Sequence, residues 1–215
     1  MLEIKNVTKR YKKGSQEFIA LDDMSIKVEK GDYVSVTGPS GAGKSTLLYI
    51  VGGLVRPDTG EVIYDGVSIY ERNGIYLDLY RKADVGFMFQ QFHLLPYLTV
   101  DDNIKLACSR EEHYDAVEMY LEKCSISGVR NKYPSELSVG EKQRTAFIRA
   151  IITKPAMLLA DEPTGNLDPG NSEVLMSLLG DYNKEGGSVI IVSHDRLAAS
   201  YADRNIVLEK GRIKA

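Results

Sequence analysis

Eight consecutive residues in the first quarter of the chain have the pattern of a phosphate-binding loop. They match G-x-x-x-x-G-K-[ST] and are Gly38, Pro39, Ser40, Gly41, Ala42, Gly43, Lys44 and Ser45, with Thr46 following. Glycines let the backbone wrap around phosphate groups with its N–H groups pointing inward. Lys44 is expected to reach the β and γ phosphates, and the Ser45 hydroxyl to bind Mg²⁺. The loop therefore predicts a site for a nucleoside triphosphate and its metal ion.

Two carboxylates follow an apolar segment later in the chain. Met157–Ala160 is continuously apolar, and Asp161 and Glu162 come directly after it. Beside a phosphate loop, Asp161 is placed to hold Mg²⁺, and Glu162 to polarise or orient an attacking water. Without the loop, the pair would indicate only an acidic turn before Pro163.

A third segment, 137–144, reads Leu-Ser-Val-Gly-Glu-Lys-Gln-Arg. Ser138 and Glu141 form an S-x-x-E capping box, which predicts the start of a helix. A helix N-terminus attracts anions, so this segment is a further candidate for a phosphate contact. The capping box alone would fit an ordinary helix equally well.

These residues need a framework of strands and helices. Apolar runs predict strands at Val34–Thr37, Val85–Phe89, Met157–Ala160, Val189–Val192 and Ile206–Glu209. Helical patterns occur at about 44–53, 140–152, 170–184 and 195–202. The alternation predicts an α/β fold with a mainly parallel sheet. The phosphate loop then lies between a strand and a helix, as its motif requires.

Two regions interrupt the alternation. The first 30 residues and the span 60–70 alternate with period two and contain the turn signal Asp65-Gly66, which suggests an antiparallel β layer. Residues 97–153 show helical patterns and no convincing strand, which suggests a helical insertion. We expect one domain over 1–215, with a nucleotide-binding core and β layer at about 1–90 and 155–215. The helical subdomain covers about 91–154.

Composition narrows the classes of function. Thirty acidic and 27 basic residues give a net charge of -3, which is no electrostatic footprint for nucleic acid. The chain starts without the apolar core of a signal peptide, and its apolar runs are too short to span a bilayer. We expect a cytosolic protein without direct membrane insertion, in which Cys108 and Cys124 are reduced thiols.

The phosphate loop, the 137–144 segment and Asp161-Glu162 together resemble the ATPase subunits of ABC transporters, in their order and spacing over essentially the whole chain. Asp161-Glu162-Pro163-Thr164-Gly165-Asn166-Leu167-Asp168 is typical of the lipoprotein-release, macrolide-export and cell-division group. The resemblance implies a P-loop NTPase core of the RecA-like type and the ABC ATPase fold. ATP and Mg²⁺ are the cofactors that it implies.

The resemblance implies further roles, residue by residue. Tyr11 matches the aromatic that stacks on adenine, although a half-buried strand tyrosine is the alternative. Gln90 matches the glutamine that contacts Mg²⁺ and the attacking water; the adjacent Gln91 leaves that assignment open by one position. Asp168 matches a loop that crosses a dimer interface. His194 matches the histidine at the γ-phosphate, and it follows a strand end where ligands of open α/β sheets bind.

In this family the 137–144 helix points at the γ-phosphate bound by a second subunit. The resemblance therefore implies an ATP-dependent homodimer, in which Ser138, Gly140 and Glu141 complete the partner's site. Val139 departs from the family, which usually has glycine there. Valine fits a helical first turn but adds bulk where a phosphate approaches, so we expect a slower ATPase that is still active.

The sequence thus predicts Mg-ATP hydrolysis that drives a separate membrane permease, with the chain peripheral on the inner face of the membrane. The permease is expected to be of an exporter or lipoprotein-release type. Phe92–Leu98 could receive a permease helix or simply pack on the helical subdomain. Another possibility is an ATP-driven dimerisation module that signals to a membrane partner without transport. A kinase or GTPase lacks the 137–144 segment. ATPases of DNA repair or translation usually carry coiled coils or two cassettes.

Overall fold

The computed structural model describes residues 1–14, 16–71, 74–108 and 111–214. Its main sheet has six strands in the order β10-β9-β3-β8-β7-β6. All neighbouring pairs are parallel except β9 with β10. The bounds are β3 Tyr33–Thr37, β6 Val85–Met88, β7 Met157–Asp161, β8 Ser188–Val192, β9 Arg204–Glu209 and β10 Arg212–Ile213.

The central strands are buried on both faces, which explains their continuous apolar runs. In β7, Leu158 and Ala160 belong to a core with helices α5 and α6, whereas Met157 and Leu159 belong to a second core with helix α1. Since successive side chains of a strand point to opposite faces, α1 and α5 pack on opposite faces of the sheet. The bounds are α1 Lys44–Val51, α5 Val139–Ile151, α6 Pro169–Lys184 and α7 Arg196–Tyr201.

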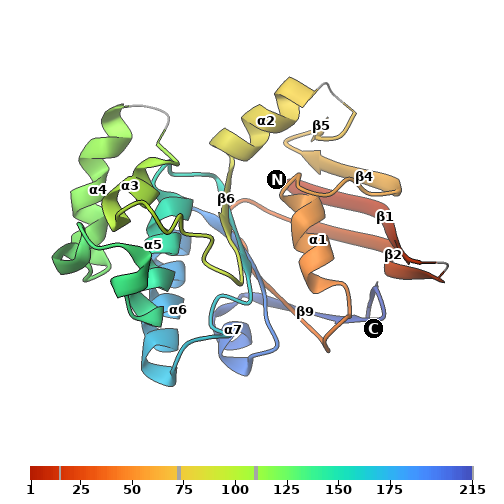
Figure 1. Ribbon diagram of the computed structural model, residues 1–215. Helices are drawn as coiled ribbons and strands as arrows, with labels where there is room; N and C mark the ends of the chain where they lie inside the picture. Colours follow the sequence, from red (N-terminus) through yellow and green to blue (C-terminus); the bar gives the residue numbers. More distant parts are fainter. Residues whose placement is uncertain (15, 72–73, 109–110, 215) are drawn as a thin grey trace.

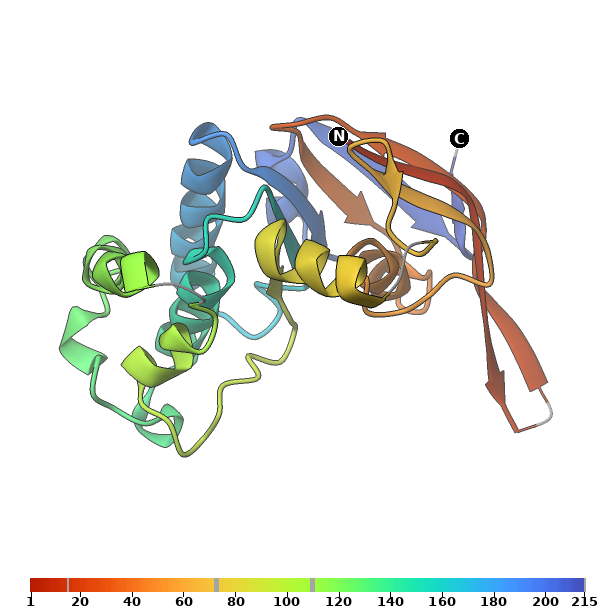
Figure 2. The same cartoon turned by 90° about the horizontal axis from the view of Figure 1, so that it is seen from above.

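A second, antiparallel sheet covers the α1 face (Figure 1). Its order is β2-β1-β4-β5. The predicted Asp65-Gly66 turn joins β4 to β5, and both residues have positive φ, at 46° and 79°. In Figure 2 the end of the β1–β2 pair projects away from the rest of the molecule. The bounds are β1 Leu2–Lys13, β2 Gln16–Val28, β4 Thr59–Tyr64 and β5 Val67–Ser68.

The segment between β6 and β7 is helical in its described residues. It holds α3 Val100–Lys105, α4 Glu111–Lys123 and α5, with 3-10 turns at Ser127–Val129 and Pro134–Glu136. One further helix, α2 Gly74–Ala83, has no counterpart among the predicted helices. In the described part of the chain, no helix is both long enough and apolar enough to cross a membrane.

The predicted fold class is confirmed: a parallel sheet, an antiparallel β layer and a helical insertion. Strand ends differ slightly from the prediction. β6 ends at Met88, one residue early, and β9 begins at Arg204, two residues before the predicted start. Gln90 therefore lies in the loop beyond β6 and not at the strand end itself.

Candidate nucleotide-binding site

The phosphate loop connects β3 to α1, and backbone contacts from two other strands hold it in place. Gly38 has φ 150°, and a Cβ there would lie 2.1 Å from the Leu208 carbonyl oxygen. Gly43 has φ 101°, and a Cβ there would lie 2.1 Å from the Ala20 carbonyl oxygen. Neither position has room for a side chain, so these two glycines are required by packing as well as by φ.

Lys44 is the first residue of α1 and is only 6% exposed. Its ammonium group donates to the carbonyl oxygens of Gly38 at 2.9 Å and Pro39 at 3.1 Å. A positive charge is therefore held at the loop itself, next to the N-terminus of a helix. Both features favour an anion at this position.

Asp161 is the last residue of β7 and is 1% exposed. Ser45 Oγ donates a hydrogen bond to Oδ1 of Asp161 at 2.9 Å. The two residues predicted to bind one metal ion are therefore direct neighbours. The Tyr49 hydroxyl donates to Oδ2, also at 2.9 Å. Burial raises the pKa of Asp161, and the two hydroxyls act against that effect. Burial, reinforced by Asp161, raises the pKa of Tyr49 to about 12, so its hydroxyl remains a donor.

Glu162 follows Asp161, and the side chains of two other predicted site residues contact its carboxylate. Its Oε2 lies 3.3 Å from Nδ1 of His194 and accepts a hydrogen bond from Nε2 of Gln90 at 3.3 Å. The Glu162 side chain is 19% exposed and that of His194 is 65% exposed, so the group faces solvent. Glu162 has φ 44°, a strained conformation for a residue with a side chain. It is Gln90, and not Gln91, whose amide reaches this carboxylate.

The donor set fits Mg²⁺ bound together with a phosphate. Among the described residues, no group of three or more His, Cys, Asp or Glu side chains could hold a metal ion by itself. Mg²⁺ at nucleotide sites does not need such a cage, because phosphate oxygens and waters complete its shell around one or two carboxylates. Ser45 and Asp161 supply a hydroxyl and a buried carboxylate side by side.

Tyr11 lies in β1, opposite Phe18 of β2. The two rings are stacked, with centroids 5.6 Å apart and planes inclined by 27°. Phe18 is 51% exposed, and its strand runs on to Ala20, whose carbonyl packs against Gly43 of the phosphate loop. The predicted adenine contact is thus a partly exposed aromatic on β1, the strand paired with the one that contacts the loop.

Ser138 is the N-cap of α5, and the predicted capping box is present. Its Oγ accepts from the backbone N–H of Glu141 at 3.3 Å, and the Glu141 carboxylate accepts from the Ser138 N–H at 2.7 Å and the Ser138 hydroxyl at 2.8 Å. The hydrogen bonds that the Glu141 carboxylate accepts lower the pKa of Glu141, and the one from the Ser138 backbone N–H has the largest effect. Because α5 and α1 pack on opposite faces of the sheet, Ser138 does not share a face with its own phosphate loop.

Gly140 is buried against Asn171, which sequence reasoning missed. A Cβ at Gly140 would lie 2.3 Å from Asn171 Oδ1. The same Oδ1 accepts from Arg144 at 2.8 Å, and Asn171 Nδ2 donates to the Asp168 carboxylate at 2.6 Å. Asp168 is the N-cap of α6, so one side chain links the start of α5 to the start of α6.

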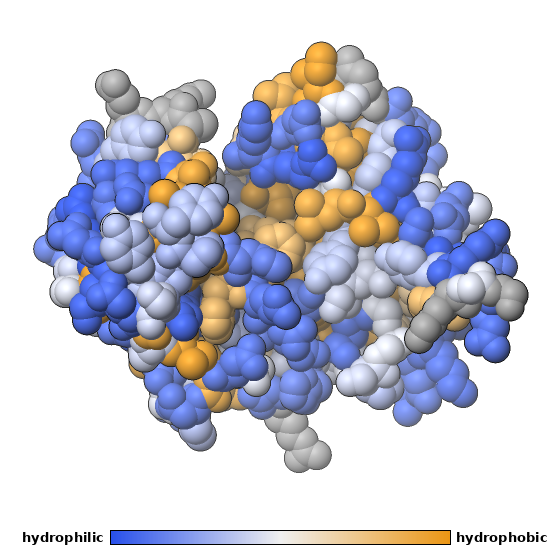
Figure 3. Space-filling view, viewed as in Figure 1, coloured by the Kyte–Doolittle hydropathy of each residue, from blue (hydrophilic) through white to orange (hydrophobic). Residues whose placement is uncertain are grey.

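A groove of about 540 Å³ lies between α2, β6 and the ends of α3 and α5. Figure 3 shows a hollow lined with hydrophobic residues between the helical part and α2. Arg149 donates to the carbonyl oxygens of Phe92 and His93, both at 2.7 Å, and so holds the segment after Gln90 at the groove. Within Phe92–Leu98, Leu94 packs on the core and Leu95 lines the groove, so the segment contributes to both.

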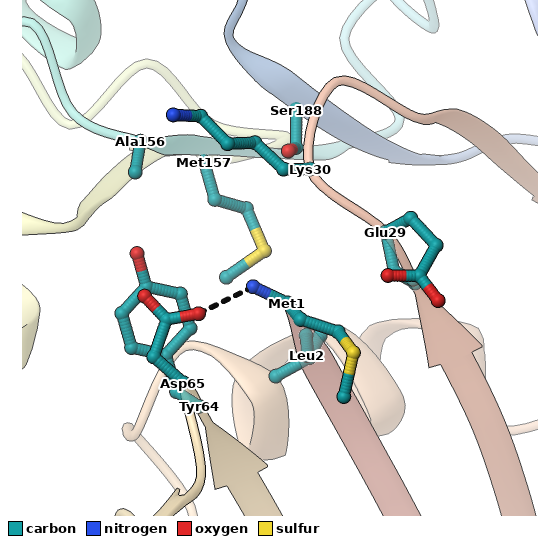
Figure 4. Close-up of a pocket in the computed structure, with 10 residues that line it drawn as sticks. Met1, Leu2, Glu29, Lys30, Tyr64, Asp65, Ala156, Met157 and Ser188 are labelled. Carbon is teal, nitrogen blue, oxygen red and sulfur yellow. Dashed lines mark hydrogen bonds and ion pairs between the residues drawn. The ribbon is translucent and has the colours of Figure 1, made fainter.

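A smaller cavity of about 130 Å³ lies at the opposite ends of the strands, near the starts of β1, β7 and β8 (Figure 4). The Met1 amino group and the Asp65 carboxylate form an ion pair of 2.6 Å at its edge. None of the predicted site residues lines it. Ligands of open α/β sheets bind at the carboxyl ends of the strands, where Asp161 and His194 lie.

Comparisons with known proteins show what the chain is similar to. A family model described as ABC transporter matches residues 21–165. The chain is 38% identical to an ABC transporter ATP-binding protein, MJ0796, of Methanocaldococcus jannaschii, over 100% of this chain and 95% of that protein. A dimeric structure of MJ0796 superposes with a TM-score of 0.93 at 37% identity, covering 100% and 97% of the two chains. A second MJ0796 structure, with the same TM-score of 0.93, is a dimer in a post-hydrolysis state bound to ADP and Pi.

Two further relatives are named after the transport systems to which they belong. The lipoprotein-releasing system ATP-binding protein LolD of Syntrophotalea carbinolica is 38% identical, over 99% of this chain and 96% of that one. The macrolide export ATP-binding/permease protein MacB of Chlorobaculum tepidum is 39% identical, over 98% of this chain and 33% of that protein. The similarity thus covers nearly all of the present chain in both cases.

Proposed function

The chain belongs to the family of ABC transporter ATP-binding subunits, and from this membership we propose that it hydrolyses Mg-ATP in a two-fold dimer to drive a separate membrane permease. It is an ATP hydrolase that powers a membrane partner. The observation that supports the proposed site is the convergence of Lys44, Ser45, Asp161, Glu162, Gln90 and His194 at one edge of the parallel sheet.

In this site the phosphate loop and Lys44 bind the phosphates of ATP. Ser45 and Asp161 hold Mg²⁺, which neutralises phosphate charge when it is bound. Tyr11, whose ring already stacks on Phe18, also stacks on the adenine. This contact needs only two flat aromatic surfaces. Residues 38–46 thus bind the charged part of the nucleotide, and the β layer binds the base.

Glu162 orients and polarises the attacking water. His194 and Gln90 contact the same carboxylate oxygen and fix the direction in which Glu162 presents its other oxygen. The strained φ of Glu162 is consistent with a residue held for function, because such strain concentrates at active sites. Gln90 lies in the loop that leads to the groove, so it is placed to report the state of the nucleotide to that surface.

The second half of each site comes from the partner subunit. Ser138, Gly140 and Glu141 begin α5 on the face opposite α1, so this helix start is available to another chain and not to its own loop. The helix N-terminus attracts the γ-phosphate bound by the other subunit. Two-fold symmetry then builds two equal sites, with Asp168 of each α6 cap near the interface. Residues 91–154 act as the subdomain that carries this helix start.

The permease binds at the groove beside Phe92–Leu98, which places the chain at the inner face of the cell membrane. The groove is lined partly by apolar side chains. Arg149 of α5 also lines it and holds the loop that follows Gln90 by two hydrogen bonds. An exporter or lipoprotein-release system is the partner type that we propose, because MacB and LolD are relatives across nearly the whole chain.

Glu162→Gln tests the hydrolytic and dimer parts of this function together. The substitution keeps the shape of the side chain but removes the base, so turnover should fall by about 100-fold or more. ATP should then remain bound and hold the dimer, and light scattering should report twice the monomer mass when Mg-ATP is added.

The matched control is Lys44→Ala in the Glu162→Gln background. It removes the ammonium that the loop holds, so this double variant should stay monomeric with ATP. If the Glu162→Gln protein also stays monomeric with Mg-ATP, the sandwich arrangement is wrong. If it still hydrolyses ATP at the wild-type rate, the role of Glu162 is wrong.

A further inference from the structure

Both carboxylate oxygens of Asp161 accept hydrogen bonds from hydroxyl groups of helix α1. Ser45 binds Oδ1 and Tyr49 binds Oδ2, each at 2.9 Å. Ser45 is part of the phosphate-loop motif, whereas that motif gives Tyr49 no role. The two residues are four positions apart, so successive turns of α1 present both hydroxyls to the same side.

The Tyr49 ring is fixed by its aromatic neighbours. Its centroid lies 5.8 Å from that of Phe87 and 6.5 Å from that of Phe89, and these two rings stack on each other at 4.2 Å. Tyrosine has few rotatable bonds, and packing on strand β6 and the residue after it removes most of the remaining freedom. The hydroxyl is therefore presented to Asp161 without further loss of side-chain entropy.

The surroundings of Asp161 leave few other groups to hold its carboxylate. The residue is buried, and the ammonium group of Lys44 donates to carbonyl oxygens of the loop. In the part of the chain that the structure describes, Oδ2 accepts a hydrogen bond only from Tyr49. Without that bond, the carboxylate could rotate about its terminal bond, and Oδ1 would lose its fixed direction beside Ser45.

We propose that Tyr49 is a positioning residue for the magnesium site, whose hydroxyl holds Oδ2 of Asp161 so that Oδ1 stays beside Ser45, where Mg²⁺ binds. The inference rests on the proposed function, since Ser45 and Asp161 bind the metal there. Tyr49 acts through Asp161 and makes no contact with the reacting atoms. Its contribution is therefore to metal affinity and not to the affinity of the loop for phosphate.

The test is Tyr49→Phe, which keeps the packed ring and removes only the hydroxyl. Calorimetry measures the affinity for a non-hydrolysable ATP analogue with Mg²⁺ and, separately, with EDTA. Loss of one hydrogen bond to a charged group should weaken analogue binding with Mg²⁺ by about tenfold. Binding in EDTA should not change, and the Mg²⁺ concentration for half-maximal ATPase activity should rise by a similar factor.

Tyr80→Phe is the matched control, because the Tyr80 hydroxyl donates to the Val51 carbonyl oxygen at the end of α1, at 2.9 Å, and not to Asp161. It should leave the Mg²⁺ dependence unchanged. Equal loss of affinity with Mg²⁺ and with EDTA in Tyr49→Phe would show a structural role and overturn the proposal, as would no loss in either. If wild-type affinity is the same with Mg²⁺ and with EDTA, the metal site itself is wrong, and with it this role of Tyr49.

Discussion

Val139 stands directly after the N-cap of α5 and is 44% exposed. Ser138 and Glu141 form the capping box around it, so valine does not disturb the helix start. Its side chain is the only large apolar group among the first three residues of the helix, which are Val139, Gly140 and Glu141. In the proposed dimer this bulk lies beside the phosphate of the other subunit and limits how closely the helix N-terminus approaches it.

Val139→Gly should therefore increase ATP turnover. Removing the side chain lets the phosphate approach the backbone N–H groups, and a gain of about fivefold corresponds to roughly 1 kcal/mol of the barrier. Glycine near a helix start should cost up to about 0.5–1 kcal/mol of folding free energy, so unfolding in urea is measured in parallel. Val139→Ala is the matched variant and should give a smaller gain. An unchanged or lower rate in Val139→Gly contradicts this role of Val139.

At the residue level, the sequence indicates which side chains lie together where a motif fixes both spacing and chemistry. Lys44, Ser45 and Asp161 come together as the phosphate loop requires, and His194 and Gln90 meet at Glu162. Tyr49 was missed, although its spacing of four from Ser45 is a signal for a shared helix face. Asn171 had no such signal, because its contacts with Gly140 and Arg144 depend on how two distant helices pack.

The junction of α5 with α6 changes the explanation of Gly140. The family resemblance implies that Gly140 is part of the partner's phosphate site, whereas the structure shows that this glycine also makes room for Asn171 of the same chain. Asn171 cannot move away freely, because Arg144 and Asp168 hold both ends of its amide. Packing alone is therefore a sufficient reason for glycine at this position.

Gly140→Ala should accordingly destabilise the fold, by about 1–3 kcal/mol, as overpacking of a tight contact does. Asn171→Ala removes the side chain that the new methyl group meets. In Gly140→Ala/Asn171→Ala the loss should be smaller than the sum of the two single losses, which a double-mutant cycle from urea unfolding measures. Additive losses would show that the Asn171 contact is not the cause. ATPase activity should stay low in the double variant if Gly140 also faces a phosphate.

At the level of elements, strands were predicted better than helices. The strands of the main sheet are buried on both faces, so each is a continuous apolar run that stands out in the sequence. Helix α2 was missed because its apolar residues do not mark a single face: Tyr76 and Leu77 pack on the core, whereas other apolar residues of the helix face outward. Ile75 and Leu79 are 69% and 58% exposed, and Tyr80 is the buried residue of this helix. Its position follows from packing beside β6 and α1, which a local pattern does not report.

On the scale of the whole molecule, α1 and α5 lie on opposite faces of one sheet, and in the proposed dimer each chain therefore supplies half of a site. In that proposal, the phosphate loop and Asp161-Glu162 face one nucleotide, and Ser138 faces the nucleotide of the other chain. Dimerisation is then part of the chemistry and not only a means of stability. Such an arrangement makes a prediction about mixed dimers that a site within one chain does not make.

The Lys44→Ala and Ser138→Asp variants should each be inactive as homodimers. A mixture of the two variants should regain ATPase activity. Aspartate is a good N-cap and its carboxylate repels the γ-phosphate, but it cannot donate to Glu141 as the Ser138 hydroxyl does, so circular dichroism checks that α5 is kept. In a mixed dimer, one site combines Lys44 of the Ser138→Asp chain with Ser138 of the Lys44→Ala chain, and the other site has both defects.

Equal mixing makes half of the dimers mixed, each with one of two sites intact, so activity should recover to about one quarter of wild type if the sites act independently. Steady-state ATPase activity of the mixture against its two components measures this recovery. Mixing wild-type protein separately with each of the two variants calibrates the exchange of subunits. A mixture no more active than its components would mean that each chain holds its whole site, because every chain in it carries one defect.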